Sequence, residues 1–148
     1  MCNRIRILQA QMKTTPLPDE AIAEVQEICH QAQSQRVNLV SLPEMFCCPY
    51  KTESFPLYAE PEGGQIFSAC ATIAKKYKLY LAAGSMAERD GQGHIYNTAY
   101  VFNPQGELVA KHRKIHLFDI DIKNGQTFKE SNTLSPGQNI TVFPTEFG

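Results

Sequence analysis

Two amphipathic helical patterns in the first half of the chain are each followed by a short apolar run, and this order constrains the fold most. Apolar side chains recur at helical spacing over residues 19–36 and 66–78, with apolar runs directly after them at 37–42 and 79–84. Alternating residues at 4–10 predict a strand before the first helix. Strands that alternate with helices usually pair in parallel through right-handed crossovers. The sequence therefore predicts an α/β fold.

After these elements the pattern changes from helices to strands. Residues 94–102 and 107–116 are predicted to form a hairpin, because the residues at 103–106 are typical of a turn. Residues 124–138 are predicted to form a loop, and residues 140–143 to start one more strand. No later segment could pair with that strand, and natural proteins avoid unprotected sheet edges. We therefore expect one domain whose sheet is incomplete.

Charge and hydropathy exclude several classes of partner. The chain carries 14 Lys and Arg residues against 15 Asp and Glu residues, for a net charge of −1. Nucleic-acid-binding domains usually present a basic patch, so no nucleic-acid partner is predicted. No apolar run approaches the roughly 18 residues of a membrane helix, and the N-terminus does not follow the signal-peptide pattern. We expect no membrane partner and a cytoplasmic location.

The five cysteines (Cys2, Cys29, Cys47, Cys48 and Cys70) are odd in number and lack the spacing of a disulfide framework. Cys29 and Cys70 fall on the apolar stripes of the predicted helices, where a free Cys acts as a small core residue. Cys47 and Cys48 are adjacent and have no second Cys or His pair nearby, as a zinc site requires. We expect reduced thiols and no metal.

Only Pro43 separates Glu44 from the end of the apolar run at 37–42. Open α/β sheets place their functional sites just beyond the carboxyl ends of the strands. The position makes Glu44 a candidate functional carboxylate, although an ordinary surface-loop glutamate fits the same pattern.

The predicted strand at 107–116 is unusually basic, and alternation gives it two faces. The first face carries Leu108, Ala110, His112, Lys114 and His116. If Leu108 and Ala110 face the core, Lys114 turns inward too, where a buried cation needs a partner or a function. A solvated basic edge strand explains the pattern equally well. A metal site at His112 and His116 is disfavoured because a third ligand is missing.

Several short motifs together resemble the nitrilase, or carbon-nitrogen hydrolase, superfamily. They are Leu42-Pro43-Glu44-Met45-Phe46, Cys48-Pro49-Tyr50, Tyr96-Asn97-Thr98-Ala99, Lys111-His112-Arg113-Lys114-Ile115-His116-Leu117-Phe118-Asp119, Phe128-Lys129-Glu130-Ser131 and Leu134-Ser135-Pro136-Gly137. The last three are similar to those of the ω-amidase branch. The resemblance implies an α-β-β-α sandwich, of which residues 1–148 would be the N-terminal half.

The resemblance implies a cofactor-free Glu-Lys-Cys thiol amidase acting on monoamides of small 2-oxo dicarboxylic acids, such as 2-oxoglutaramate and 2-oxosuccinamate. Glu44 would be the general base, and Lys114 would stabilise the oxyanion. Glu130 would keep Lys114 charged and orient the substrate amide. The implied substrate-binding residues are Phe46, Tyr50 and His116. Family members suggest a homodimer or a larger homo-oligomer for the full-length protein.

The resemblance also implies that the nucleophile lies outside this chain. In the superfamily it occupies a Gly-x-x-x-Cys-Tyr-Asp-like turn, and none of the five cysteines has that context. The chain is therefore predicted to be truncated before the nucleophile and inactive alone. Two alternatives stay open: another branch, such as an aliphatic amidase or N-carbamoyl-amine hydrolase, or a non-catalytic fragment that binds a full-length relative. His112, where Tyr is common, and residues 121–125, where Pro-Gly is frequent, leave the exact substrate open.

Overall fold

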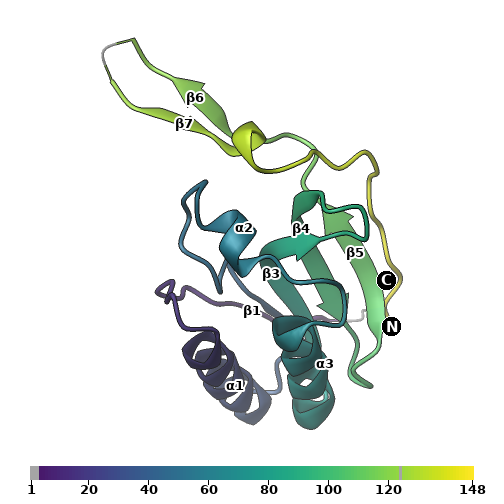
Figure 1. Ribbon diagram of the computed structural model, residues 1–148. Coiled ribbons are helices and arrows are strands. Elements are labelled where there is room, and N and C mark those ends of the chain that lie inside the picture. The colour runs from purple at the N-terminus through teal and green to yellow at the C-terminus, as the bar shows by residue number, and fades with distance from the viewer. Residues whose placement is uncertain (1–3, 124) are drawn as a thin grey trace.

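The computed structural model describes residues 4–123 and 125–148, and its centre is a five-stranded mixed sheet in the order β1-β2-β3-β4-β5 (Figure 1). The strands are β1 (Ile7–Gln9), β2 (Leu39–Ser41), β3 (Tyr80–Arg89), β4 (Ile95–Phe102) and β5 (Leu108–Arg113). The first three pair in parallel, as predicted, and β3, β4 and β5 form an antiparallel meander. Cys2 and Asn124, which entered the sequence predictions, lie outside the described residues.

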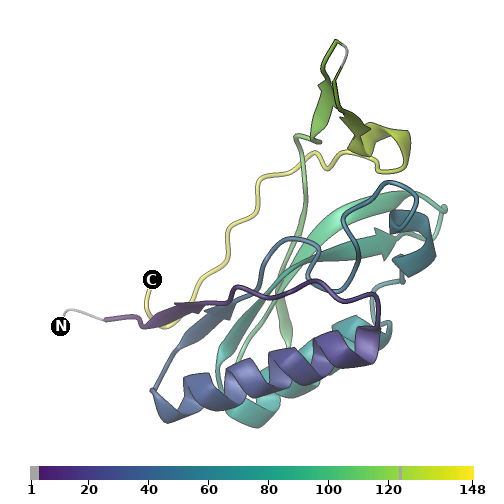
Figure 2. The ribbon, with the colours of Figure 1, turned by 90° about the vertical axis from the view of Figure 1, so that its left-hand side faces the viewer.

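Helices α1 (Pro18–Ser34) and α3 (Gln65–Tyr77) lie side by side on one face of this sheet (Figure 2). Their apolar stripes form the main core with the inner face of the sheet, and Cys29 and Cys70 are buried in it as predicted. The first helix begins one residue before the predicted range of 19–36, with Leu17 as the N-cap and Pro18 at its first position. Asp19 lies in the first turn, where its charge suits the helix dipole. Within the described residues, no helix has both the length and the apolarity needed to cross a membrane.

Four short elements were not predicted. The short helix α2 (Phe55–Tyr58) lies in the loop between β2 and α3. Strands β6 (Asp119–Asp121) and β7 (Thr127–Lys129) form a hairpin that projects from the body of the molecule (Figure 1). The 3-10 turn η1 (Glu130–Asn132) follows β7, so the predicted loop at 124–138 is in part structured. Such short elements carry too few residues to show a period in the sequence.

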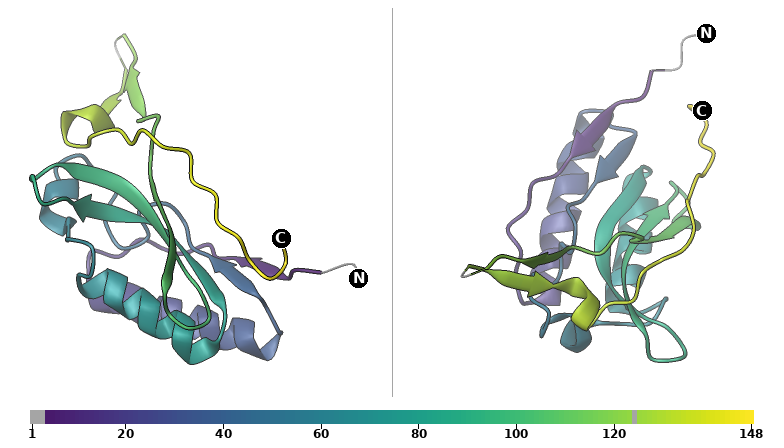
Figure 3. Two further views of the ribbon diagram at one scale, coloured as in Figure 1. Left: turned by 90° about the vertical axis from the view of Figure 1, so that its right-hand side faces the viewer. Right: turned by 90° about the horizontal axis from the view of Figure 1, so that it is seen from above.

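The predicted strand at 140–143 is wrong. Residues 138–145 run across the sheet face opposite the helices without joining any strand, and residues 146–147 form a turn (Figure 3). Thr141 Oγ1 donates to the carbonyl of Lys111 at 3.1 Å, and Tyr80 Oη donates to Glu146 at 2.5 Å. Ile140 and Val142 are 87% and 89% exposed. The segment has the alternation of a strand, but no described segment lies beside it to pair with it.

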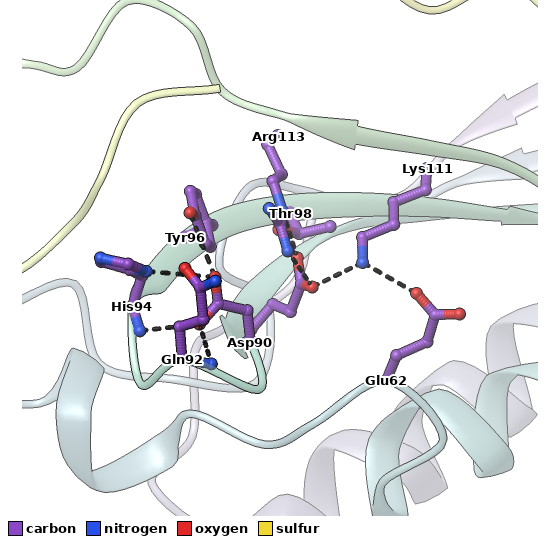
Figure 4. Close-up of polar contacts among 9 residues, drawn as sticks. Glu62, Asp90, Gln92, His94, Tyr96, Thr98, Lys111 and Arg113 are labelled. Carbon is purple, nitrogen blue, oxygen red and sulfur yellow. Dashed lines mark hydrogen bonds and ion pairs between the residues drawn. The ribbon is translucent and has the colours of Figure 1, made fainter. Parts of the chain in front are cut away.

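A buried ion-pair cluster fixes β5 against β3 and β4. Glu88 is 3% exposed, and its carboxylate binds Arg113 at 2.7 and 3.0 Å, Lys111 at 2.5 Å and Thr98 at 2.6 Å. Figure 4 shows Thr98, Lys111 and Arg113 converging on this carboxylate. Glu62 is a second, outer partner of Lys111, at 2.8 Å. Lys111 and Arg113 thus share one face of β5, as alternation predicts, and His112 faces the other way. Leu108, which alternation placed with Ala110, is 37% exposed at the start of the edge strand.

Candidate active site

Three charged side chains from distant parts of the sequence meet at one end of the sheet. Lys114 Nζ lies 2.8 Å from Glu44 Oε1 and 3.0 Å from Glu130 Oε2. Glu44 follows β2, Lys114 follows β5, and Glu130 opens η1. The structure therefore brings together the three residues predicted as catalytic.

Glu44 is positioned by close contacts between its loop and β3. Met45 N–H donates to Ser85 Oγ at 3.0 Å, and Asn97 Nδ2 donates to Glu44 Oε1 at 2.7 Å. A Cβ at Gly84 would lie 1.9 Å from the carbonyl oxygen of Pro43, so only glycine lets the loop approach this closely. Glu44 keeps 48% of its side chain exposed, so the carboxylate is both anchored and accessible.

Lys114 is held by its backbone although β5 ends at Arg113. Its N–H donates to the carbonyl of Asn97 at 2.8 Å, and its carbonyl accepts from Gly137 N–H at 2.8 Å. A Cβ at Gly137 would lie 2.1 Å from the carbonyl oxygen of Arg113. Lys114 is therefore fixed from both sides, by β4 and by the segment that follows η1.

Glu130 is completely buried and accepts three hydrogen bonds. Its partners are Phe118 N–H at 2.6 Å, Tyr50 Oη at 2.6 Å and Lys114 Nζ at 3.0 Å. Tyr50 also stacks on Phe128 of β7, with ring centroids 5.5 Å apart. A buried carboxylate is tolerated because each of these donors compensates for lost water.

These contacts set the protonation states. Burial alone would lower the pKa of Lys114, but its hydrogen bonds to Glu44 and Glu130 outweigh burial and raise that pKa above its usual value. Burial would raise the pKa of Glu130, yet the donors Phe118, Tyr50 and Lys114 bring it below its usual value. Burial and the hydrogen bond to Glu130 raise the pKa of Tyr50. The lysine is an ammonium at neutral pH and Glu130 a carboxylate.

A cavity of about 470 Å³ opens beside Glu44 and Lys114. Its lining residues are Glu44, Gly84, Ser85, Asn97, Ala99, His112, Lys114, Ile115 and His116. His116, predicted to bind substrate, lines this cavity. Phe46, predicted for the same role, is instead 1% exposed and packs in the main core. The prediction for Phe46 therefore needs correction, because residues 44–47 form a turn, with Met45 at a φ of 49°, and this turn places Phe46 in the core while Glu44 lines the cavity.

Asn97 and Ser85 were missed by the sequence interpretation. Asn97 is 3% exposed on β4 and connects Glu44 to Lys114. Its side-chain amide donates to the Glu44 carboxylate, and its backbone carbonyl accepts from Lys114 N–H. An asparagine within a strand of mostly aromatic and aliphatic residues is a usable signal, since a buried amide needs partners. Ser85 gave no comparable signal, because its role depends on the loop that passes over β3.

The four described cysteines are poor nucleophiles. All are buried, and burial raises the pKa values of Cys29, Cys47 and Cys48 to about 12. A thiol must ionise to attack or to bind a metal. Among the described residues, no three His, Cys, Asp or Glu side chains are grouped as a metal site requires.

Alanine at Gly84 is expected to lower the free energy of unfolding by about 3 kcal/mol, the upper end of the usual cost of overpacking. The new methyl group would meet the carbonyl oxygens of Pro43 and Leu42, which are backbone atoms and cannot rotate away. Denaturant unfolding followed by circular dichroism measures the loss. Gly91→Ala is the control, since its Cβ meets nothing within 4 Å. Equal stability of the two variants would contradict the close approach.

The buried Glu130 carboxylate should make stability depend on pH. Its pKa is lower in the folded chain than the roughly 4.3 of an unfolded glutamate. The contribution of ionised Glu130 to the free energy of unfolding is therefore complete above about pH 4.3, and it disappears as the pH falls through the pKa of the folded state. The difference in unfolding free energy between wild type and Glu130→Gln should shrink from pH 6 to pH 3. A difference that is constant or grows on acidification would contradict a stabilising ionised Glu130.

Comparison with known proteins gives close matches over nearly the whole chain. Residues 4–148 match the family model for carbon-nitrogen hydrolases. The chain is 42% identical to omega-amidase NIT2 of Mus musculus over 142 residues, 96% of this chain and 51% of that protein. It is 39% identical to omega-amidase NIT2 of Danio rerio, over 98% of this chain and 52% of that protein. The crystal structure of Saccharomyces cerevisiae Nit3, from branch 10 of the nitrilase superfamily, matches with a TM-score of 0.83 and 32% identity, over 97% of this chain and 52% of that one. The chain spans about half the length of the relatives it matches.

Proposed function

The chain belongs to the carbon-nitrogen hydrolase family, with the nitrilase-like α/β fold and the ω-amidase-like motifs that the sequence predicted, and from this we propose that Glu44, Lys114 and Glu130 are catalytic residues of an ω-amidase. The substrates would be monoamides of small 2-oxo dicarboxylic acids, such as 2-oxoglutaramate and 2-oxosuccinamate. One observation carries the proposal: a lysine ammonium held between two carboxylates, at 2.8 and 3.0 Å, beside an open cavity.

The proposed chemistry uses a cysteine thiol from a part of the enzyme beyond residue 148. Glu44 takes the thiol proton, and the sulfur forms a bond to the amide carbon. An N–H of Lys114 stabilises the oxyanion of the tetrahedral intermediate. The C–N bond then breaks as the nitrogen takes up the proton held by Glu44, and ammonia leaves. Glu44 next activates a water molecule, which hydrolyses the thioester and regenerates the thiol.

The geometry supports this division of roles. Glu44 is half exposed and anchored by Asn97, so it can exchange protons with groups in the cavity. Glu130 is buried and fully bonded, so it serves to hold the charge and position of Lys114. The buried, un-ionised thiols of Cys47 and Cys48 support the proposal that residues 1–148 alone do not hydrolyse amides. The complete enzyme is proposed to be cytoplasmic and homo-oligomeric.

Lys114→Ala tests the proposal in protein produced from the complete coding sequence. Loss of one oxyanion donor should lower kcat for ammonia release from 2-oxoglutaramate by about 10² to 10³. Lys76→Ala, an exposed substitution on α3, is the matched control and should keep the wild-type rate. Wild-type turnover by Lys114→Ala would exclude the assigned role. Faster wild-type hydrolysis of propionamide or of an N-carbamoyl amine would instead point to another branch of the family.

A further inference from the structure

His112 occupies the wall between two cavities. It lines the cavity beside Glu44 and Lys114, and also a smaller cavity of about 270 Å³ beneath residues 140–143. It lies on β5, two residues before Lys114, on the face opposite the Glu88 cluster. The mechanism proposed above gives this side chain no role.

A hydrogen-bond chain fixes the ring of His112. Thr141 Oγ1 donates its single proton to the carbonyl of Lys111 at 3.1 Å, and it lies 3.2 Å from His112 Nδ1. With that proton committed, Thr141 can only accept from His112, so Nδ1 carries a hydrogen. Thr141 lines the smaller cavity and not the larger one. Among the described contacts Nε2 makes none, so it is available to a group in the larger cavity, which the residue also lines. The contact with Thr141 survives when both nitrogens are protonated.

The charges of the described residues around Lys114 favour a further cation beside the larger cavity. Glu44 and Glu130 together carry two negative charges, and Lys114 compensates only one of them. Glu130 is buried and does not line the cavity, but together with Glu44 and Lys114 it gives these three described groups a net charge of −1. The other cavity-lining side chains that can become cationic are His112 and His116, and among the described contacts only His112 has a hydrogen-bond partner that fixes its ring.

We propose that His112, as an imidazolium anchored to Thr141, binds the carboxylate of the substrate through Nε2–H and so selects amides that carry an acid group. The inference rests on the proposed function, whose substrates are monoamides of dicarboxylic acids. A nearby carboxylate favours the imidazolium, so binding would take up a proton at Nε2. His112 would be a specificity residue, separate from the three groups that act on the amide.

Nitrogen NMR of the 148-residue chain tests this directly, with succinamate and succinamide as probes. The two molecules share a skeleton, and only succinamate carries a carboxylate. In the free chain, the neutral His112 should show a proton on Nδ1. Succinamate at constant pH should move both ring nitrogens toward the imidazolium positions, and succinamide should not. A proton on Nε2 of the free neutral ring, equal responses to both probes, or no response of His112 to succinamate would overturn the proposal.

Variants separate a binding role from a structural one. His112→Gln should weaken succinamate binding about tenfold or more, because a charged hydrogen bond is lost. Thr141→Val keeps the ring but removes its anchor, and it should weaken binding several-fold. His94→Gln, at a 52% exposed histidine in the β3–β4 turn, is the matched control and should bind as wild type does. Wild-type affinity in His112→Gln would overturn the proposal, and the dispersion of the amide spectrum reports whether each variant is folded.

The proposed function is tested separately, by measuring ammonia release from 2-oxoglutaramate. If the complete enzyme releases ammonia and His112→Gln keeps the wild-type KM, the inference on His112 is wrong and the function stands. If the complete enzyme releases none while succinamate still binds through His112, the function is wrong and the binding role stands.

Discussion

Glu88→Gln is expected to lower the free energy of unfolding by about 3 kcal/mol. Removing one partner of a buried ion pair typically costs about 3 to 5 kcal/mol, because the other charge is left without compensation. Here Lys111 and Arg113 retain 29% exposure each, so water can partly solvate them and the lower end applies. Burial would raise the pKa of Glu88, but hydrogen bonds from Arg113, Lys111 and Thr98 keep it below its usual value, so the carboxylate is ionised at neutral pH.

Guanidinium unfolding at pH 7 measures this effect, with Glu62→Gln as the matched control. Glu62 binds the same Lys111 but is 47% exposed, and exposed ion pairs contribute about 0 to 1 kcal/mol. The control should therefore lose less than about 1 kcal/mol. Equal losses in both variants would show that burial of Glu88 does not decide the strength of the cluster.

The Glu88 cluster also bears on the site. Lys111 and Arg113 flank His112 in the sequence, and Arg113 immediately precedes Lys114. Their attachment to Glu88 therefore fixes the direction in which the end of β5 presents His112 and Lys114. A shift of the β5 register by one residue would move each of its side chains to the opposite face of the sheet. Loss of the cluster should therefore disturb the cavity as well as stability.

Much of the fold could be predicted, because its larger elements have clear periods. The apolar stripes that include Val25 and Cys70 predicted α1 and α3, and the apolar run ending at Leu42 predicted β2. The hairpin of β6 and β7 could not be predicted from three-residue strands. The end of the chain was misjudged for a different reason: Ile140 and Val142 alternate as in a strand, but a strand is defined by a neighbour.

The site was predictable in its residue types but not in its contacts. The position of Glu44 after β2 follows from the α/β pattern. Lys114 was indicated by alternation along its strand and by the motifs that resemble the family, and Glu130 by those motifs alone. Sequence periodicity gives no access to the burial of Glu130, which depends on Phe118 N–H and on Tyr50, a residue eighty positions away. Phe46 was assigned to substrate binding from the resemblance to the family, but the backbone turns its side chain into the core.

The central claim is that Glu44 is the proton-transferring group of an amide-hydrolysing site. It is tested most directly by kcat/KM for ammonia release from 2-oxoglutaramate, measured on the protein from the complete coding sequence and on its Glu44→Gln variant. Gln keeps the shape and can still accept hydrogen bonds from Asn97 and Lys114, but it cannot take a proton. We predict that wild type is active, that Glu44→Gln loses about 10² to 10⁴ of this rate, and that Glu53→Gln, an exposed substitution in the same loop, changes nothing. Undiminished hydrolysis by Glu44→Gln, or none by the wild type, would contradict the claim.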